Sequence, residues 1–173
     1  SDRERLLGYL EGSGRIILRE PEALLSPASK MPGLDGQKMS KSYNNTITLR
    51  EDPGEIGQKL RTMPTDPARV RRTDPGNPDI CPVWQLHEVY SDDGVKSWVR
   101  EGCTSAGIGC LDCKQPVIDS VLAELGPVQE RAAEFEQDPA RVRAIINEGS
   151  EAARDLAQQT LEEVRAAMGL EYT

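Results

Sequence analysis

Hydrophobic positions recur at helical spacing through most of the chain after residue 50. Ile56 and Leu60 form one apolar stripe, and the preceding Asp52-Pro53 suits the cap and first turn of a helix that runs to about Met63. From residue 82 onward the same spacing predicts further helices. The apolar residues expected to face inward in the first two of these helices are Val83, Trp84, Leu86, Val89, Val95, Trp98 and Val99. The later helical pattern carries Val117, Ile118, Val121, Leu122, Leu125, Val128, Phe135, Val142, Ile145, Ile146, Ala153, Leu156, Ala157, Leu161 and Val164.

Glycine and proline divide this helical pattern. Residues 102–113 predict a glycine- and cysteine-rich loop, followed by a long helix over 115–137 that Gly126-Pro127 should kink or break. Asp138-Pro139 caps the next helix, and Gly149-Ser150 is expected to separate it from a last helix over residues 151–168. Residues 64–80 carry four prolines and therefore predict a rigid loop.

The first 50 residues carry a different pattern. Asp2 to Gly12 predicts a short amphipathic helix, and Arg15 to Arg19 predicts a short buried strand. Prolines then keep the backbone extended up to residue 32. Such a piece fits the end of a larger α/β nucleotide-binding domain and is too small to be that domain. We therefore expect a mainly α protein with a small α/β part over residues 1–50 and a helical domain over residues 51–173.

Composition limits the kind of protein. Of 173 residues, 29% are charged and 37% hydrophobic, no apolar run approaches a membrane span, and Ser1 begins no signal peptide, so a cytoplasmic location is expected. The net charge is −8, and residues 81–173 hold 17 acidic against 8 basic side chains. This acidic half argues against non-specific wrapping of nucleic acid, so any such contact needs a local basic patch. The candidates just before that half are Lys59, Arg61, Arg69, Arg71 and Arg72.

The most informative stretch is residues 32–47, here called the lysine loop, whose centre reads Lys38-Met39-Ser40-Lys41-Ser42. Two ammonium groups with hydroxyl and backbone N–H donors, on a loop flanked by glycines, suit a phosphate chain. A loop of this kind that closes on a polyphosphate can stabilise a leaving pyrophosphate. Composition alone favours the alternative, a solvated loop of lysine and serine.

The order of these residues resembles the KMSKS signature of class I aminoacyl-tRNA synthetases. The flanking residues 32–37 and 43–47 are similar to the tryptophanyl-tRNA synthetase version, as are residues 61–66 and 168–170. From residue 21 onward the chain resembles the second half of a bacterial tryptophanyl-tRNA synthetase. The resemblance implies that residues 1–50 are the remnant of a Rossmann-type catalytic domain, and that residues 51–173 form the helical anticodon-binding domain.

The resemblance also implies a chemistry. In that family the carboxylate of tryptophan attacks the α-phosphate of ATP, which is bound with Mg²⁺, and the tryptophanyl group then passes from the adenylate to tRNA(Trp). Lys41 would stabilise the pyrophosphate, with Lys38 as a second catalytic cation. The implied ATP-binding residues are Lys38, Met39, Ser40, Lys41 and Ser42.

One catalytic signature of that class is missing. His-Ile-Gly-His needs two histidines, and the chain has one, His87, in a helical stretch where a core or surface role is expected. The chain alone is therefore expected to be inactive, and an intact enzyme would form a homodimer through the missing catalytic domain. Two other interpretations stay open: a stand-alone, non-catalytic tRNA-binding protein, and a structural or redox-sensing metal module.

The four cysteines are Cys81, Cys103, Cys110 and Cys113, spaced C-x21-C-x6-C-x2-C. Three of them lie in a glycine-rich stretch with little apolar content, which favours a four-thiolate metal site over unrelated thiols. Zinc and a [4Fe–4S] cluster are both served by four thiolates. The wide spacing favours the cluster, and it resembles the cysteine pattern of the iron–sulfur subset of tryptophanyl-tRNA synthetases.

Cations near these cysteines give a tentative RNA site. Arg69, Arg71 and Arg72 lie on the proline-rich loop, and Lys114 follows Cys113 directly. A metal group that gathers the cysteines would draw these cations onto one basic face, where phosphate contacts set affinity for tRNA. The alternative is that Arg71 and Arg72 pair with Asp74 or Asp79 and only solvate the loop.

Overall fold

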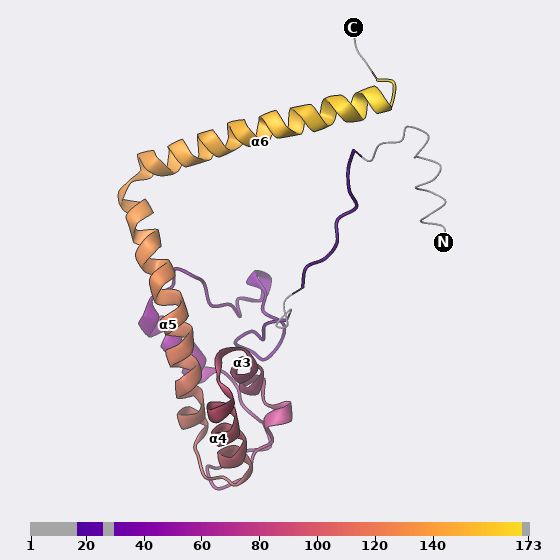
Figure 1. Cartoon of the computed structure of the whole chain (residues 1–173). Helices are drawn as coiled ribbons and strands as arrows, with labels where there is room; N and C mark the ends of the chain where they lie inside the picture. Colours follow the sequence, from indigo (N-terminus) through magenta and orange to yellow (C-terminus); the bar gives the residue numbers. More distant parts are fainter. Residues whose placement is uncertain (1–16, 26–29, 171–173) are drawn as a thin grey trace, which may run out of the picture. The chain divides into compact units, whose positions relative to one another are not determined.

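The computed structural model describes residues 17–25 and 30–170 (Figure 1). The chain divides into two compact units, and one of them, Leu25–Glu136, holds every site residue predicted from the sequence. The described residues form no β-strand, only one isolated antiparallel bridge between Pro32 and Lys38. The prediction of a mainly α protein is therefore confirmed.

The predicted N-terminal strand is wrong where it can be compared. Residues 17–19 form a bend and irregular backbone, and Leu18 is 67% exposed, so it does not lie in a buried strand. The rest of that strand and the predicted helix over Asp2–Gly12 lie outside the described residues. Whether residues 1–50 derive from a Rossmann-type domain stays a prediction.

The helix α2, Pro53–Thr62, forms where its cap predicts it. The Asp52 carboxylate accepts hydrogen bonds from the N–H groups of Gly54 and Glu55, and Pro53 needs no partner at the first position because it has no N–H. The predicted loop after α2 contains only a short turn of 3-10 helix, Pro78–Ile80. Two helices then follow in close succession, α3 (Pro82–Tyr90) and α4 (Asp93–Thr104).

The two longest helices are α5 (Cys110–Gln137) and α6 (Pro139–Ala167). Asp138 caps α6 as predicted, because its carboxylate accepts the N–H of Arg141 at 3.0 Å. The predicted separation at Gly149-Ser150 is wrong, because α6 runs through it. Of the kink or break predicted at Gly126-Pro127, the break is wrong, because α5 continues through these residues. In α6 the single glycine costs only about 1 kcal/mol, and the surrounding alanine, glutamate and arginine residues favour a helix.

The glycine- and cysteine-rich loop is also shorter than predicted. Since α4 extends to Thr104 and α5 begins at Cys110, only residues 105–109 remain as loop. Ile108 packs closely on α4, where a side chain at Gly102 would come within 2.8 Å of it. Three cysteines therefore lie on helices: Cys103 near the end of α4, with Cys110 and Cys113 in the first turn of α5.

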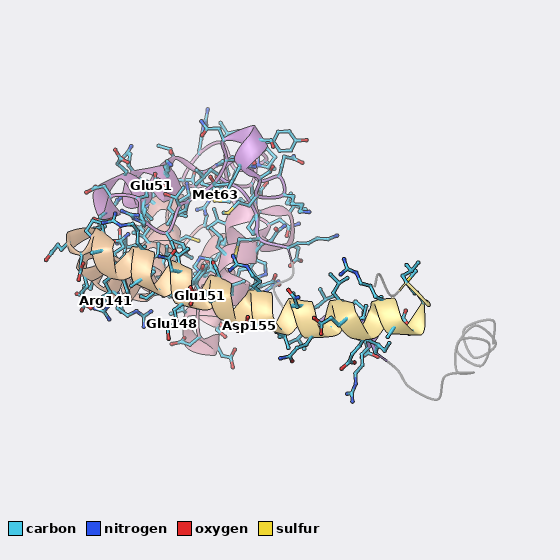
Figure 2. All side chains as sticks on the ribbon, turned by 90° about the horizontal axis from the view of Figure 1, so that it is seen from above. Glu51, Met63, Arg141, Glu148, Glu151 and Asp155 are labelled. Carbon is cyan, nitrogen blue, oxygen red and sulfur yellow. The ribbon has the colours of Figure 1, made fainter. Side chains whose placement is uncertain are left out.

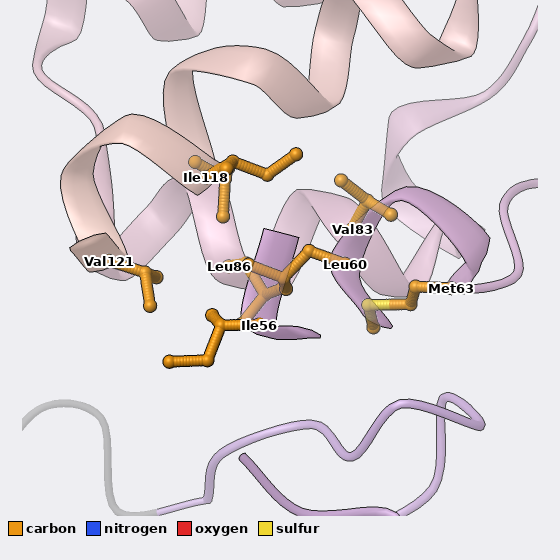
Figure 3. Packing of buried hydrophobic residues seen from close by; sticks show 8 residues of the cluster. Ile56, Leu60, Met63, Val83, Leu86, Ile118 and Val121 are labelled. Atoms are coloured by element: carbon orange, nitrogen blue, oxygen red, sulfur yellow. The ribbon is translucent and has the colours of Figure 1, made fainter. Parts of the chain in front are cut away.

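The core of this unit lies between α2, α3 and α5 (Figure 3). Each fully buried aliphatic side chain stabilises the fold by about 1.5–3 kcal/mol relative to an exposed one. The buried residues are Ile56, Leu60 and Met63 from α2 and its end, Val83 and Leu86 from α3, and Val117, Ile118 and Val121 from α5.

The helix α6 belongs to the other unit and contains no buried residue. Glu148, Glu151 and Asp155 are exposed acidic residues along it (Figure 2). Apolar residues at helical spacing, Ile145 and Leu156 among them, are also exposed, at 50% and 67%. Across the described part of the chain, no helix combines the length and the apolar character that crossing a bilayer requires.

Candidate functional site

The lysine loop is a closed, hydrogen-bonded turn. The Gly33 N–H donates to the Gln37 carbonyl at 2.6 Å, and the Met39 N–H donates to the Met31 carbonyl at 3.0 Å. Gly36 completes the turn at φ +80°, a conformation that glycine adopts without steric cost. Lys41–Tyr43 then forms one turn of 3-10 helix. The loop therefore has a defined, hydrogen-bonded backbone.

Asn45 holds this loop together from inside. Its side chain is only 3% exposed. Its amide NH₂ donates to the Asp35 carboxylate at 2.7 Å and to the Lys38 carbonyl at 3.2 Å, and its side-chain oxygen accepts the Ser40 N–H at 2.7 Å. One buried amide thus fixes the backbone on both sides of Met39. The sequence analysis did not single out this residue.

Asn45 packs so closely against Gly33 that no larger residue fits at position 33. An added Cβ on Gly33 would lie 2.2 Å from the Asn45 amide nitrogen, so this position must be glycine. The hydrogen bond from Asn45 and a second one from the Gln37 N–H lower the pKa of Asp35, so that this carboxylate stays charged and remains an acceptor. The signal in the sequence is the Asn44-Asn45 pair, of which only the second member is buried.

Both lysines of the loop project into solvent. Lys38 and Lys41 are exposed, and neither forms an ion pair with an acid among the described residues. Met39 instead turns inward and lines an apolar cavity of about 210 Å³ together with Leu60 and Leu86. The loop thus presents two unpaired cations on its outer side while its central methionine contacts the helical core.

Segments around the loop attach it to the helices. Glu51, seen in Figure 2, forms an ion pair with Lys59 of α2 and accepts the Thr48 N–H at 3.1 Å. Gln129 of α5 donates to the carbonyls of Leu49 and Glu51 at 3.2 and 2.9 Å. The chain that leaves the lysine loop is therefore held against both helices.

The four cysteines come from the three helices that meet near residue 81. Cys81 is the residue before α3, Cys103 lies on α4, and Cys110 and Cys113 lie on α5. All four are unpaired and partly buried. Cys81, Cys103 and Cys113 line one small cavity of about 20 Å³, and Cys110 lines the adjacent groove.

The cysteines are close enough to influence one another. Burial, followed by the charges of the other three thiols, raises the pKa of Cys113 to about 12. Burial also raises the pKa of Cys103, and the nearby charge of Arg69 partly opposes that rise. Charges on neighbouring sulfur atoms therefore act on both Cys103 and Cys113. As the side chains stand, no three ligand-type side chains of the described residues are placed to hold a metal ion.

His87 lies beside the cysteines. The ring is fully buried, with Nδ1 2.8 Å from the Ser91 hydroxyl and Nε2 3.4 Å from the Cys113 sulfur. Burial lowers the pKa of His87, so the imidazole is neutral near pH 7. The prediction of a core or surface histidine did not foresee the sulfur contact, since it depends on the packing of α3 against α5.

The structure separates the four cations of the tentative RNA site. Arg69 is 9% exposed and Lys114 is 5% exposed. The Lys114 ammonium donates to the carbonyls of Arg61 and Met63 at the end of α2, at 2.7 and 2.5 Å. Arg71 and Arg72 are the two exposed cations of the set.

The acidic partners of Arg71 and Arg72 differ in part from those expected from the sequence. Arg72 lies 3.6 Å from the Asp112 carboxylate, and Asp74 accepts the backbone N–H of Arg71. Both arginines line an open groove of about 400 Å³ whose other wall is residues 109–112. The part of the proline-rich loop that carries Arg71 and Arg72 therefore lies beside the cysteine-bearing start of α5.

Comparison with known proteins places the chain in a class. Residues 5–126 match the family model described as tRNA synthetases class I (W and Y), which covers more than half of the sequence, so the chain belongs to this family. The tryptophan–tRNA ligase of Ralstonia nicotianae is 63% identical over 99% of this chain, and that of Thermotoga maritima is 48% identical over 90%. The chain spans 43% and 48% of these two proteins.

Solved structures agree on the fold. The tryptophanyl-tRNA synthetase of Campylobacter jejuni, crystallised with ADP and tryptophan, matches 96% of this chain and 52% of its own with a TM-score of 0.72 at 23% identity. The enzyme of Aeropyrum pernix matches 62% of this chain and 31% of its own, with a TM-score of 0.52 at 30% identity.

Proposed function

We propose that this chain is part of a tryptophan–tRNA ligase and supplies its lysine loop and its helical anticodon-binding domain. The substrates are tryptophan, ATP with Mg²⁺, and tRNA(Trp), and the chain without the other half of the active site is inactive. We expect the intact enzyme to be a homodimer through its catalytic domain. The similarity to tryptophan–tRNA ligases supports this reaction, and the lysine loop gives the chain a chemical role in it.

The observation that carries the proposal is the arrangement of the lysine loop. A buried asparagine orders its backbone, while the ammonium groups of Lys38 and Lys41 stay exposed and unpaired among the described residues. In the activation step a tryptophan carboxylate oxygen bonds to the α-phosphorus of ATP as the bond to the β-phosphate oxygen breaks. Negative charge grows on the departing pyrophosphate, and preorganised cations stabilise that charge most strongly in the transition state.

Lys41→Ala in the intact protein tests this role. We expect the barrier to activation to rise by about 2–4 kcal/mol, with little change in tryptophan binding, because the lysine meets charge that appears only as pyrophosphate leaves. Exchange of labelled pyrophosphate into ATP measures the rate, and Lys30→Ala, at another exposed lysine, is the matched control. Unchanged turnover with weakened tryptophan affinity would contradict this assignment.

For the cysteines, the proposed ligand set is Cys81, Cys103, Cys110 and Cys113. The support is their number, their thiol chemistry and their mutual electrostatic influence, rather than a ligand geometry already formed. When bound, a [4Fe–4S] cluster, or zinc in the alternative, would supply a covalent cross-link between α3, α4 and α5.

Metal analysis of the intact protein purified without oxygen tests this site. We expect about four irons and four acid-labile sulfides per chain for the cluster. Zinc without sulfide would select the alternative metal. Protein that binds neither would leave the cysteines as ordinary partly buried thiols.

A further inference from the structure

Arg69 is a buried cation beside Cys103. Its Nη2 donates to the carbonyls of Arg72 and Ile108, at 3.0 and 2.5 Å, and so joins the proline-rich loop to the turn before α5. Its Nη1 lies 3.9 Å from the Cys103 sulfur as a long hydrogen bond. Gly76 lies between them, since a Cβ there would come within 2.6 Å of that sulfur and 3.2 Å of the Arg69 Cδ.

This guanidinium is incompletely satisfied by the protein. Its Nε–H is buried and has no hydrogen-bond partner, the one such side-chain atom found among the described residues. No carboxylate of the described residues pairs with Arg69 either, because Asp66, the nearest acid in sequence, uses its oxygens on the N–H groups of Ala68 and Asn77. A buried charge without an opposite charge is strongly destabilising. A negative charge next to the Arg69 guanidinium would therefore stabilise the fold.

The cysteines would provide that anion once they bind metal. Neutral thiols do not balance a guanidinium, whereas four thiolates around Zn²⁺ or a [4Fe–4S]²⁺ core carry a net charge of about −2. Cys103 is the ligand next to Arg69, and a hydrogen bond to a metal-bound sulfur is a usual way for a protein to tune such a group.

We propose that Arg69 is a positioning residue for the four-cysteine metal group, acting through the Cys103 sulfur to offset its negative charge. This inference rests on the metal site proposed above. It assigns Arg69 to the protein interior and removes it from the set of tRNA-contacting cations.

The test compares three variants of the intact protein, each loaded anaerobically with iron and sulfide and, separately, with zinc. Arg69→Gln removes the charge but keeps N–H donors for the two carbonyls, and Arg69→Lys keeps the charge but has fewer donors. Arg71→Gln is the control, since Arg71 is an exposed cation of the same loop. The measurements are metal content, the rate of metal loss to a chelator, and the free energy of unfolding with and without metal.

We expect Arg69→Gln to lose metal about 10–100-fold faster than the control, with Arg69→Lys in between. The metal-dependent gain in stability should fall in the same order. If Arg69 only ties two loops together, both substitutions will lower the stability of loaded and metal-free protein equally, with unchanged metal release, and the inference is overturned. Wild-type protein that binds neither metal overturns the cysteine site itself, a result distinct from the previous one.

Discussion

Replacing Asn45 by alanine gives the most direct test of how the lysine loop is held. The change deletes three hydrogen bonds at once: those to the Asp35 carboxylate and the Lys38 carbonyl, and the one from the Ser40 N–H. It touches neither Lys38 nor Lys41 themselves. Any effect on catalysis must therefore come from the order of the backbone that carries them.

The loss of stability in Asn45→Ala depends on whether each former hydrogen-bond partner of Asn45 can bind water instead. Asp35 is exposed and can bind water instead, so its loss is small. The Ser40 N–H and the Lys38 carbonyl bond within a partly buried turn, where an unsatisfied group costs about 1–3 kcal/mol. We take about 2 kcal/mol as the destabilisation of the ordered loop. At 1.36 kcal/mol for each factor of ten, this lowers kcat/KM for ATP by up to about 30-fold.

The assay is pyrophosphate exchange in the intact protein, with ATP and tryptophan varied separately. We expect kcat/KM for ATP to fall, the KM for tryptophan to stay unchanged, and the pKa of Asp35 to rise towards 3.8, its ordinary value, because its main stabilising hydrogen bond is gone. Asn44→Gly is the matched control, because Asn44 is exposed and its φ of +52° suits glycine. Equal kinetics for the Asn45→Ala and Asn44→Gly proteins would refute the reasoning.

Two further outcomes follow from the charged groups. Burial opposes ionisation of Glu51, but its hydrogen bonds with Lys59 and Thr48 outweigh burial and lower its pKa, so its contribution to stability is present above pH 4.5 and is lost as the pH falls below that value. Urea unfolding at several pH values should therefore show a steeper acid loss for wild type than for Glu51→Gln, and parallel curves would contradict this. Changing both Arg71 and Arg72 to Glu should weaken tRNA binding and reduce its salt dependence, with metal content and folding unchanged. The control is Arg100→Glu, at an exposed arginine paired with Asp79. If the salt dependence of tRNA binding is the same in the double variant and in wild type, the RNA site lies elsewhere.

Local chemistry was enough to predict the parts of the fold that depend on neighbours in sequence. The caps at Asp52 and Asp138 are examples, because a carboxylate before a proline bonds N–H groups two or three positions further on. Gly149 shows the limit of the same reasoning. A glycine weakens a helix by a small amount, and the residues around it in α6 supply enough helical preference to continue.

The candidate site depended more on tertiary packing. A charged side chain is expected at the surface, so nothing in the sequence indicated that Lys114 would turn inward to bond the last carbonyls of α2. The role of Asn45 could not be predicted from the sequence for a similar reason. Its importance comes from three partners, up to ten residues away, that only the closed turn brings together.

The unequal exposure of the lysines has a consequence for chemical labelling. Among the described residues the exposed lysines are Lys30, Lys38 and Lys41, which lie within one short segment, whereas Lys59 and Lys96 are partly covered and Lys114 is buried. An amine-directed reagent at low dose would therefore mark the lysine loop ahead of the helices. Covalent modification can thus serve as a footprint of this loop, and protection by a bound polyphosphate would appear as a loss of label in a single peptide.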